Sequence, residues 1–224
     1  MTTPDIPYTI RRSARARRVR VNVRPLAHTR EVGVEVVLPA RVSERAAAAA
    51  VTELRPWIER RVREAHQTLA RVAERGATVP YLGQPLALVA QPGRTRVHRR
   101  GELLLVPDGD ARPALERFYR REARMEIAAR LDRATALAGI PYSGLSIRAQ
   151  RSRWASCSAK GRMSFNWRLL MAPESVLDYV VWHEVCHLEV PNHSPRFWAL
   201  VERHWPCFRD DREWLRRHGA TLVL

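Results

Sequence analysis

Alternating apolar and polar positions near the start of the chain predict a pair of β-strands. Val19, Val21 and Val23 alternate with basic or amide side chains, and residues 32–38 repeat the same period of two. That period gives each strand one apolar and one polar face. The turn-forming segment 28–30 lies between the two runs, so we expect them to pair as neighbours in a sheet.

A helical period of apolar residues follows. Ser43 predicts the N-cap of an alanine-rich helix, Pro56 restarts it, and the apolar face continues to about Arg75, where Gly76 ends it. Three short strands are then expected, separated by turns at Pro92-Gly93 and Arg100-Gly101. The expected strands are Tyr81–Ala90, Arg94–His98 and Glu102–Val106.

The polar, turn-rich segment 107–110 predicts a domain boundary near the middle of the chain. We therefore expect two domains, a basic N-terminal α+β domain at 1–110 and a catalytic domain at 111–224. Both are of the α+β class: the N-terminal domain is the smaller, and the catalytic domain is expected to combine helices with a small antiparallel sheet.

The second half has a clear order of elements. Pro113 opens a long helix that ends at Gly139, and Pro173 opens another helix. Between them a hairpin is expected, which would place an edge strand beside the second of these helices. Its arms are Leu145–Ser156 and Arg162–Arg168, and two further helices are expected at Pro195–His204, capped by Ser194, and at Asp210–His218.

Composition is that of a soluble globular protein, with 46% hydrophobic and 28% charged residues in 224. No run of 18 apolar residues predicts a membrane span, and no signal-peptide pattern precedes the first arginines. The three cysteines lack the spacing of a disulfide framework. A cytoplasmic location is therefore expected.

The net charge of +16 predicts a negatively charged partner. Residues 11–30 contain eight arginines and no acid. Two interpretations remain open: a basic surface that binds nucleic acid non-specifically, or a solvated face of the sheet.

The strongest chemical pattern is H-E-x-x-H at residues 183–187. Positions four apart share one helix face, so the imidazoles of His183 and His187 can reach one metal ion. Leu177, Val181 and Val185 form an apolar stripe beside that face, as in a half-buried helix. Pro191 ends the helix and lets the chain turn back to present His193.

Three histidines and one water make an open tetrahedral zinc site, with one Zn²⁺ expected per chain. Glu184 lies about 100° around the helix from His183, where its carboxylate can act as a general base on a water at the metal. Cys186 is expected to be a packed side chain and not a ligand, because a fourth protein ligand would close the site. The pattern thus predicts a metal-dependent hydrolase.

Four further residues are candidates for stabilising an oxyanion or contacting the substrate. They are Tyr179, Asn166, Arg153 and His204. Each also has a structural interpretation, as a core ring, a turn hydrogen bonder, a surface charge and a helix-end cation respectively. Arg148, Arg151 and Arg153 could likewise hold phosphates or simply line a solvated strand.

These patterns resemble the YgjP-like metallopeptidases, relatives of the SprT and WLM-type zinc proteases. The resemblance covers nearly the whole chain and is strongest after residue 110. It rests on R-W-A-S-C-S at 153–158, on S-F-N-W-R-L-L at 164–170, on D-Y-V-V at 178–181, and on the motif that continues through Asn192-His193-Ser194 to Phe197-Trp198.

The resemblance implies a zincin-type catalytic domain with zinc on His183, His187 and His193 and catalysis by Glu184. Ala155 departs from the family, which usually has glycine there. Related proteases digest proteins crosslinked to DNA, which would fit the basic charge. Some YgjP-like proteins have instead been credited with hydrolysing UTP to UMP and diphosphate.

The leading hypothesis is a zinc-dependent peptidase that acts on protein or peptide substrates, including proteins associated with DNA. The alternatives are a metal-dependent nucleotide pyrophosphatase and a zinc-stabilised nucleic-acid-binding protein without turnover. No membrane partner is expected. Glu184 favours the two enzymes over the binder, because a structural zinc site has no need of a base.

Overall fold

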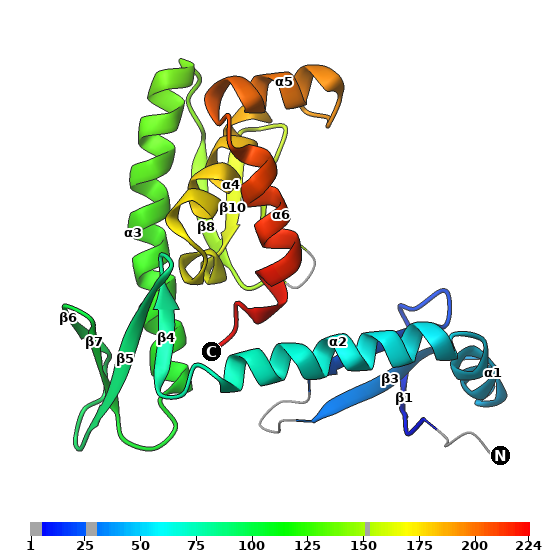
Figure 1. Cartoon of the computed structure of the whole chain (residues 1–224). Helices are drawn as coiled ribbons and strands as arrows, with labels where there is room; N and C mark the ends of the chain where they lie inside the picture. Colours follow the sequence, from blue (N-terminus) through cyan, green and yellow to red (C-terminus); the bar gives the residue numbers. More distant parts are fainter. Residues whose placement is uncertain (1–5, 26–30, 151–152) are drawn as a thin grey trace. The chain divides into compact units, whose positions relative to one another are not determined.

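The computed structural model describes residues 6–25, 31–150 and 153–224 (Figure 1). The chain forms two compact units, Met1–Glu74 and Arg75–Leu224. Each has its own hydrophobic core. Among the described residues, no helix combines the length and the apolar character that crossing a bilayer requires.

The N-terminal unit contains a three-stranded sheet in the order β1-β3-β2. Its strands are β1 (Thr9–Ser13), β2 (Arg20–Pro25) and β3 (Val32–Pro39). The expected pairing of the two valine-rich runs is confirmed, because β2 is antiparallel to β3. The sequence did not predict β1, which pairs parallel to β3. The predicted turn at 28–30 lies outside the described residues.

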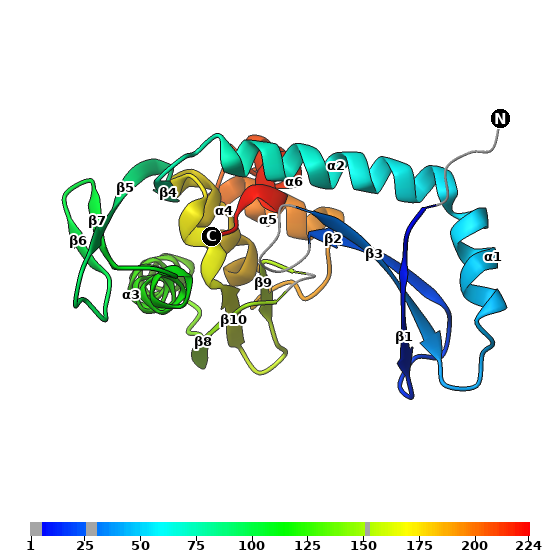
Figure 2. The same ribbon diagram turned by 90° about the horizontal axis from the view of Figure 1, so that it is seen from below.

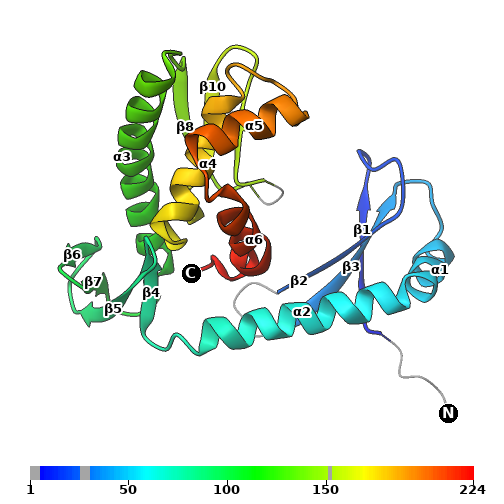
Figure 3. The same ribbon diagram turned by 45° about the horizontal axis from the view of Figure 1, so that its top comes forward.

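Two helices cover the apolar face of this sheet, α1 (Arg45–Glu53) and α2 (Arg55–Ala73) (Figures 2 and 3). Pro56 lies in the first turn of α2, as expected. Ser43 is not the N-cap of α1, since the helix begins after Glu44 and no side chain caps it. Val36, Leu38 and Ile58 are fully buried between the sheet and the helices.

The C-terminal unit begins with a four-stranded sheet in the order β4-β5-β7-β6. Its strands are β4 (Thr78–Tyr81), β5 (Gln84–Gln91), β6 (His98–Arg100) and β7 (Leu103–Pro107). The expected strand at Tyr81–Ala90 is wrong at its start, because Leu82 and Gly83 adopt positive φ values of 48° and 83° and form a turn. The strand expected at Arg94–His98 begins only at His98.

The chain divides into its two compact units between Glu74 and Arg75, so the expected boundary at 110/111 falls inside the second unit. The residues on either side of the expected boundary share one hydrophobic core. Leu86 and Leu104 from the four-stranded sheet are buried together with Leu115 and Ile127 from the helix that follows. A polar turn at 107–110 therefore connects two parts of one core.

That helix is α3 (Arg112–Ala138), and it ends as expected at Gly139, which adopts a left-handed φ of 70°. A second small sheet follows in the order β8-β10-β9. Its strands are β8 (Gly144–Arg148), β9 (Ala155–Cys157) and β10 (Arg162–Asn166). The hairpin exists between β9 and β10, but its expected first arm is interrupted. Because β8 pairs parallel to β10, this sheet is mixed and not antiparallel as expected.

A 3₁₀ helix, η1 (Trp167–Met171), leads from this sheet into α4 (Glu174–Cys186). Two further helices follow, α5 (Pro195–His204) and α6 (Phe208–His218), and a 3₁₀ turn, η2 (Gly219–Thr221), comes near the end. In the C-terminal unit α4 packs against α3, α5, α6 and the edge strand β9 (Figure 1). Its apolar stripe of Leu177, Val181 and Val185 is buried, as predicted.

A buried arginine fixes the start of α4 on α3. Arg130 is 5% exposed and forms ion pairs with Glu126, Glu174 and Asp178. Its contact with Glu174 is 2.6 Å and its contact with Asp178 is 2.9 Å. Since Glu174 and Asp178 are one turn apart on α4, the network sets both the position and the rotation of that helix.

Candidate metal centre

The side chains of His183, His187 and His193 converge at the end of α4, with all three ligand atoms within 4.8 Å of one another. The Nε2 atom of His193 lies 3.0 Å from that of His183 and 3.2 Å from that of His187. Of the described residues, this is the single group of three or more potential metal ligands that meets so closely.

These spacings fit a tetrahedral metal ion. Zinc binds imidazole nitrogens at about 2.0–2.1 Å, so two ligands on a tetrahedron lie roughly 3.3 Å apart. The two observed Nε2 separations are within a few tenths of an ångström of that value. Three unprotonated ring nitrogens that face one another form a donor set suited to a cation.

The end of α4 determines how the second histidine is presented. The helix ends at Cys186 with His187 as its C-cap, slightly earlier than expected, and the chain turns before Pro191. The Nδ1 atom of His187 lies 3.1 Å from the carbonyl oxygen of Val190 and can donate its proton there. That hydrogen bond would leave Nε2 unprotonated and facing the other two rings, the form that ligates a metal.

Electrostatics favour the neutral form of the two helix histidines. Burial, together with the charges of His187, His193 and Arg212, lowers the pKa of His183 to about 3. Burial also lowers the pKa of His187, and His193 acts in the same direction, while the Val190 carbonyl opposes them. Both rings are therefore available as uncharged ligands near neutral pH.

The ring of Phe197 packs against all three imidazoles. Phe197 is fully buried, and its ring centre lies 4.4–4.9 Å from those of His183, His187 and His193. It stacks on His187 and meets the other two edge to face. The sequence placed Phe197 in a helix and in the family resemblance but did not predict this contact, which depends on the chain turning back after Asn192.

Glu184 lies on the inner side of the same helix, beside β9. It is 4% exposed, and its Oε2 atom has no hydrogen-bond partner among the described residues. Burial raises the pKa of Glu184 to about 8, while the backbone N–H of Cys157 and the charge of Arg153 act to lower it. A buried carboxyl group with one unsatisfied oxygen is suited to proton transfer.

Tyr179 is one turn before His183 on the same face of α4, and their ring centres are 5.9 Å apart. Burial raises the pKa of Tyr179 to about 12, so the hydroxyl remains a donor at neutral pH.

Asn166 lies near β9, and both the oxygen and the nitrogen of its side-chain amide already have hydrogen-bond partners. It donates to the carbonyl of Gln150 at 2.7 Å and accepts from the N–H of Arg168 at 3.2 Å.

The other two predicted contacts lie at the margins of the cluster. Arg153 precedes β9 and is close enough for its charge to act on Glu184. His204, at the end of α5, stacks on Trp182 with ring centres 4.4 Å apart and does not join the three histidines. Cys186 is buried in the core, and burial raises its pKa to about 12, so it is a packed thiol.

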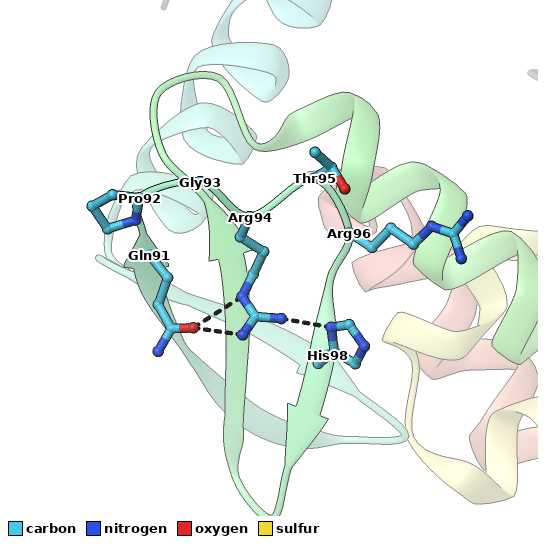
Figure 4. Close-up of a pocket in the computed structure, with 7 residues that line it drawn as sticks. All are labelled: Gln91, Pro92, Gly93, Arg94, Thr95, Arg96 and His98. Atoms are coloured by element: carbon cyan, nitrogen blue, oxygen red, sulfur yellow. Dashed lines mark hydrogen bonds between the residues drawn. The ribbon is translucent and has the colours of Figure 1, made fainter.

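A surface cavity of about 350 Å³ lies at the loop between β5 and β6, which is distant in sequence from the three histidines (Figure 4). Its central side chain, Arg94, donates to Gln91 and contacts the Nδ1 atom of His98. Arg96 points away from Arg94 in Figure 4. The cations of this cavity therefore do not converge on a common point.

Comparison with known proteins places the chain in a class. The family model of the YgjP-like metallopeptidase domain matches residues 17–218. At the level of the family, the protein is therefore a hydrolase of the metallopeptidase class. It belongs to the YgjP-like family.

A crystal structure of the metallopeptidase zymogen of Pyrococcus abyssi abylysin is similar to part of the chain. The similarity covers 39% of this chain and 89% of the other, with 25% sequence identity and a TM-score of 0.36. A search of curated proteins found no match.

Proposed function

We propose that this protein is a zinc-dependent peptidase in which His183, His187 and His193 hold one Zn²⁺ and Glu184 is the general base. The observation that carries the proposal is the pairing of three converging imidazoles with a buried, partly unsatisfied carboxyl on the same helix. Zinc at such a site supplies Lewis-acid chemistry, polarising a carbonyl and activating water.

The protein's own groups then have distinct tasks. Glu184 takes a proton from the attacking water at its unsatisfied Oε2 atom and returns it to the leaving amine. Cys157 and Arg153 favour the ionised form of that carboxyl against the effect of burial, and the charge of a bound zinc ion would favour it further. Tyr179, protonated and on the histidine face, is our choice as the donor to the developing oxyanion.

The basic N-terminal unit supports recruitment of substrates bound to nucleic acid. Arg15, Arg17, Arg18 and Arg20 are all exposed. Within the described residues, no carboxylate forms an ion pair with any of the four. Such a surface attracts phosphates without sequence preference and weakly at high salt.

The test compares zinc-loaded wild type with Glu184→Gln on a basic DNA-binding protein, with and without single-stranded DNA. We expect the variant to bind zinc normally and to cleave roughly 10²- to 10⁴-fold more slowly, because the proton acceptor is lost. New fragments are measured by mass. Glu189→Gln is the control, since Glu189 is partly exposed and pairs with Arg196.

Equal cleavage by wild type and Glu184→Gln would contradict the proposed role of Glu184. Cleavage that depends on DNA would support recruitment through the basic surface. Diphosphate release from UTP without peptide fragments would instead favour a nucleotide pyrophosphatase.

A further inference from the structure

Helix α6 carries four arginines, and one of them differs from the others in its contacts. Arg209 pairs with Glu202 at 2.5 Å, and Arg216 and Arg217 both pair with Glu213 at 2.5–2.6 Å. Arg212 is exposed and forms no ion pair with any carboxylate of the described residues. Its charge is therefore available to a ligand.

The backbone around Arg212 is firmly placed. The preceding residue, Asp211, is buried and accepts hydrogen bonds from the hydroxyl of Ser175 and the indole N–H of Trp205, both at 2.7 Å. Both carboxylate oxygens of Asp211 thus accept from these two donors, and neither forms an ion pair with Arg212. The bond from Ser175 attaches α6 to the first turn of α4, and the bond from Trp205 attaches it to the end of α5.

The guanidinium of Arg212 lies beside the histidine cluster. It is 4.6 Å from the ring centre of Trp198, and that ring is stacked 5.6 Å from His193 and lies 5.8 Å from His183. The charge of Arg212 also acts on the pKa values of His183 and Tyr179. Because His193 is exposed, the cluster is open to solvent at that imidazole.

We propose that Arg212 binds a carboxylate of the substrate, held one to three residues from the bond that is cut. The inference rests on the proposed peptidase function and adds a substrate class to it. The guanidinium lies within roughly 10 Å of the imidazole of His193, a span that an extended peptide covers in about three residues.

The chemistry of the contact explains the choice of ligand. A guanidinium packed on an indole face retains free N–H groups, which match the two oxygens of a carboxylate. Contact with Trp198 also reduces the number of orientations that the side chain must give up on binding. The carboxylate can come from an acidic side chain or from the C-terminus of a peptide.

Four peptides separate these two sources. They share one sequence, taken from a cleavage site found in the assay above or, if none is found, from an extended neutral segment of the DNA-binding protein. Each carries Glu or Gln two residues beyond the cut or central bond and ends one residue later in a free carboxylate or an amide. Cleavage gives kcat and KM for zinc-loaded wild type, Arg212→Gln and Arg212→Lys. Binding to the Glu184→Gln and Glu184→Gln/Arg212→Gln proteins is measured by calorimetry.

We expect Arg212→Gln to raise KM and Kd about 10- to 100-fold for peptides with the preferred carboxylate and to leave kcat nearly unchanged. For the peptide with Gln and an amide end, KM and Kd should be the same in wild type and Arg212→Gln. Arg212→Lys should recover part of the affinity, because it keeps the charge but not the forked geometry. Arg216→Gln, on the same helix, is the control, and zinc affinity should be equal in all variants.

Equal use of all four peptides by wild type would overturn the inference while leaving the peptidase proposal intact. An equal loss by Arg212→Gln on charged and neutral peptides would also overturn it, since it would indicate a structural role. If no peptide is cleaved but the acidic peptides still require Arg212 for tight binding, the carboxylate site stands and the peptidase proposal fails.

Discussion

Both ends of α4 carry ionisable side chains, and the two ends differ in whether those side chains have partners. At the start, Glu174 and Asp178 pair with the buried Arg130, and the hydroxyl of Ser175 donates to Asp211. At the other end, the Nδ1 atom of His183 and the Oε2 atom of Glu184 are buried without a hydrogen-bond partner among the described residues. Completed polar networks stabilise a fold, whereas unsatisfied buried groups cost free energy and point to function.

Removing a ligand at the histidine end is expected to have the largest effect. Four-ligand zinc sites contribute about 10–16 kcal/mol, or about 2.5–4 kcal/mol for each ligand, so His187→Ala should weaken zinc binding by about that amount. Without zinc the variant should lose only the hydrogen bond to Val190 and the ring contact with Phe197, a loss of about 1–2 kcal/mol relative to the metal-free wild type. Competition with a chelator and thermal unfolding measure the two quantities.

His204→Ala is the control for the metal site, because His204 stacks on Trp182 outside the cluster. Its zinc affinity should equal that of the wild type. Unchanged zinc affinity in His187→Ala would contradict the proposed ligand set.

The next largest effect is expected at the start of the helix. Arg130→Ala leaves Glu126, Glu174 and Asp178 without their shared cation and should lower the free energy of unfolding by about 3 kcal/mol. The expected loss is at the low end of the range for breaking a buried ion pair, because the three carboxylates are partly exposed. Urea unfolding measures the loss, and zinc affinity of the folded fraction should change little.

Arg120→Ala serves as the comparison on α3. Arg120 forms an exposed pair with Glu116 one turn away, which contributes about 0.3–0.5 kcal/mol. Similar losses for Arg120→Ala and Arg130→Ala would show that the Arg130 network is not special.

The smallest expected effect concerns the hydrogen bond between Ser175 and Asp211. Ser175→Ala should lower the free energy of unfolding by about 1 kcal/mol, because Asp211 keeps its second donor, Trp205. Urea unfolding measures it. A fall in zinc affinity larger than the fall in stability would mean that the two ends of α4 are coupled more tightly than their contacts indicate.

The sequence predicted the elements that carry local signals and missed those that depend on distant contacts. The period of Val19 to Val23, the Pro113 start and the Gly139 end are all local, and the structure confirms them. The pairings of β1 with β3 and of β8 with β10 are parallel and join separate parts of the chain, so no nearby turn announces them. The turn at Leu82 has a non-glycine residue at positive φ, which sequence patterns rarely indicate.

The candidate site shows the same division. His183, Glu184 and His187 follow from helical spacing alone, and the structure brings His193 to them after the Pro191 turn. Arg212 is 19 residues beyond His193 in a helix with three other arginines, and its sequence does not distinguish it from them. Only the carboxylate partners of the other three, seen in the folded chain, identify Arg212 as the available cation.

The three histidines and the ring of Phe197 beneath them all lie within residues 183–197. The surroundings of Glu184 come instead from β9, almost thirty residues earlier, and from the sheet that holds it. In the mechanism proposed above, metal binding would need only a short loop closure, whereas Glu184 would acquire its environment only when the sheet docks on the helix. A folding chain would then bind its metal before it can cleave a substrate.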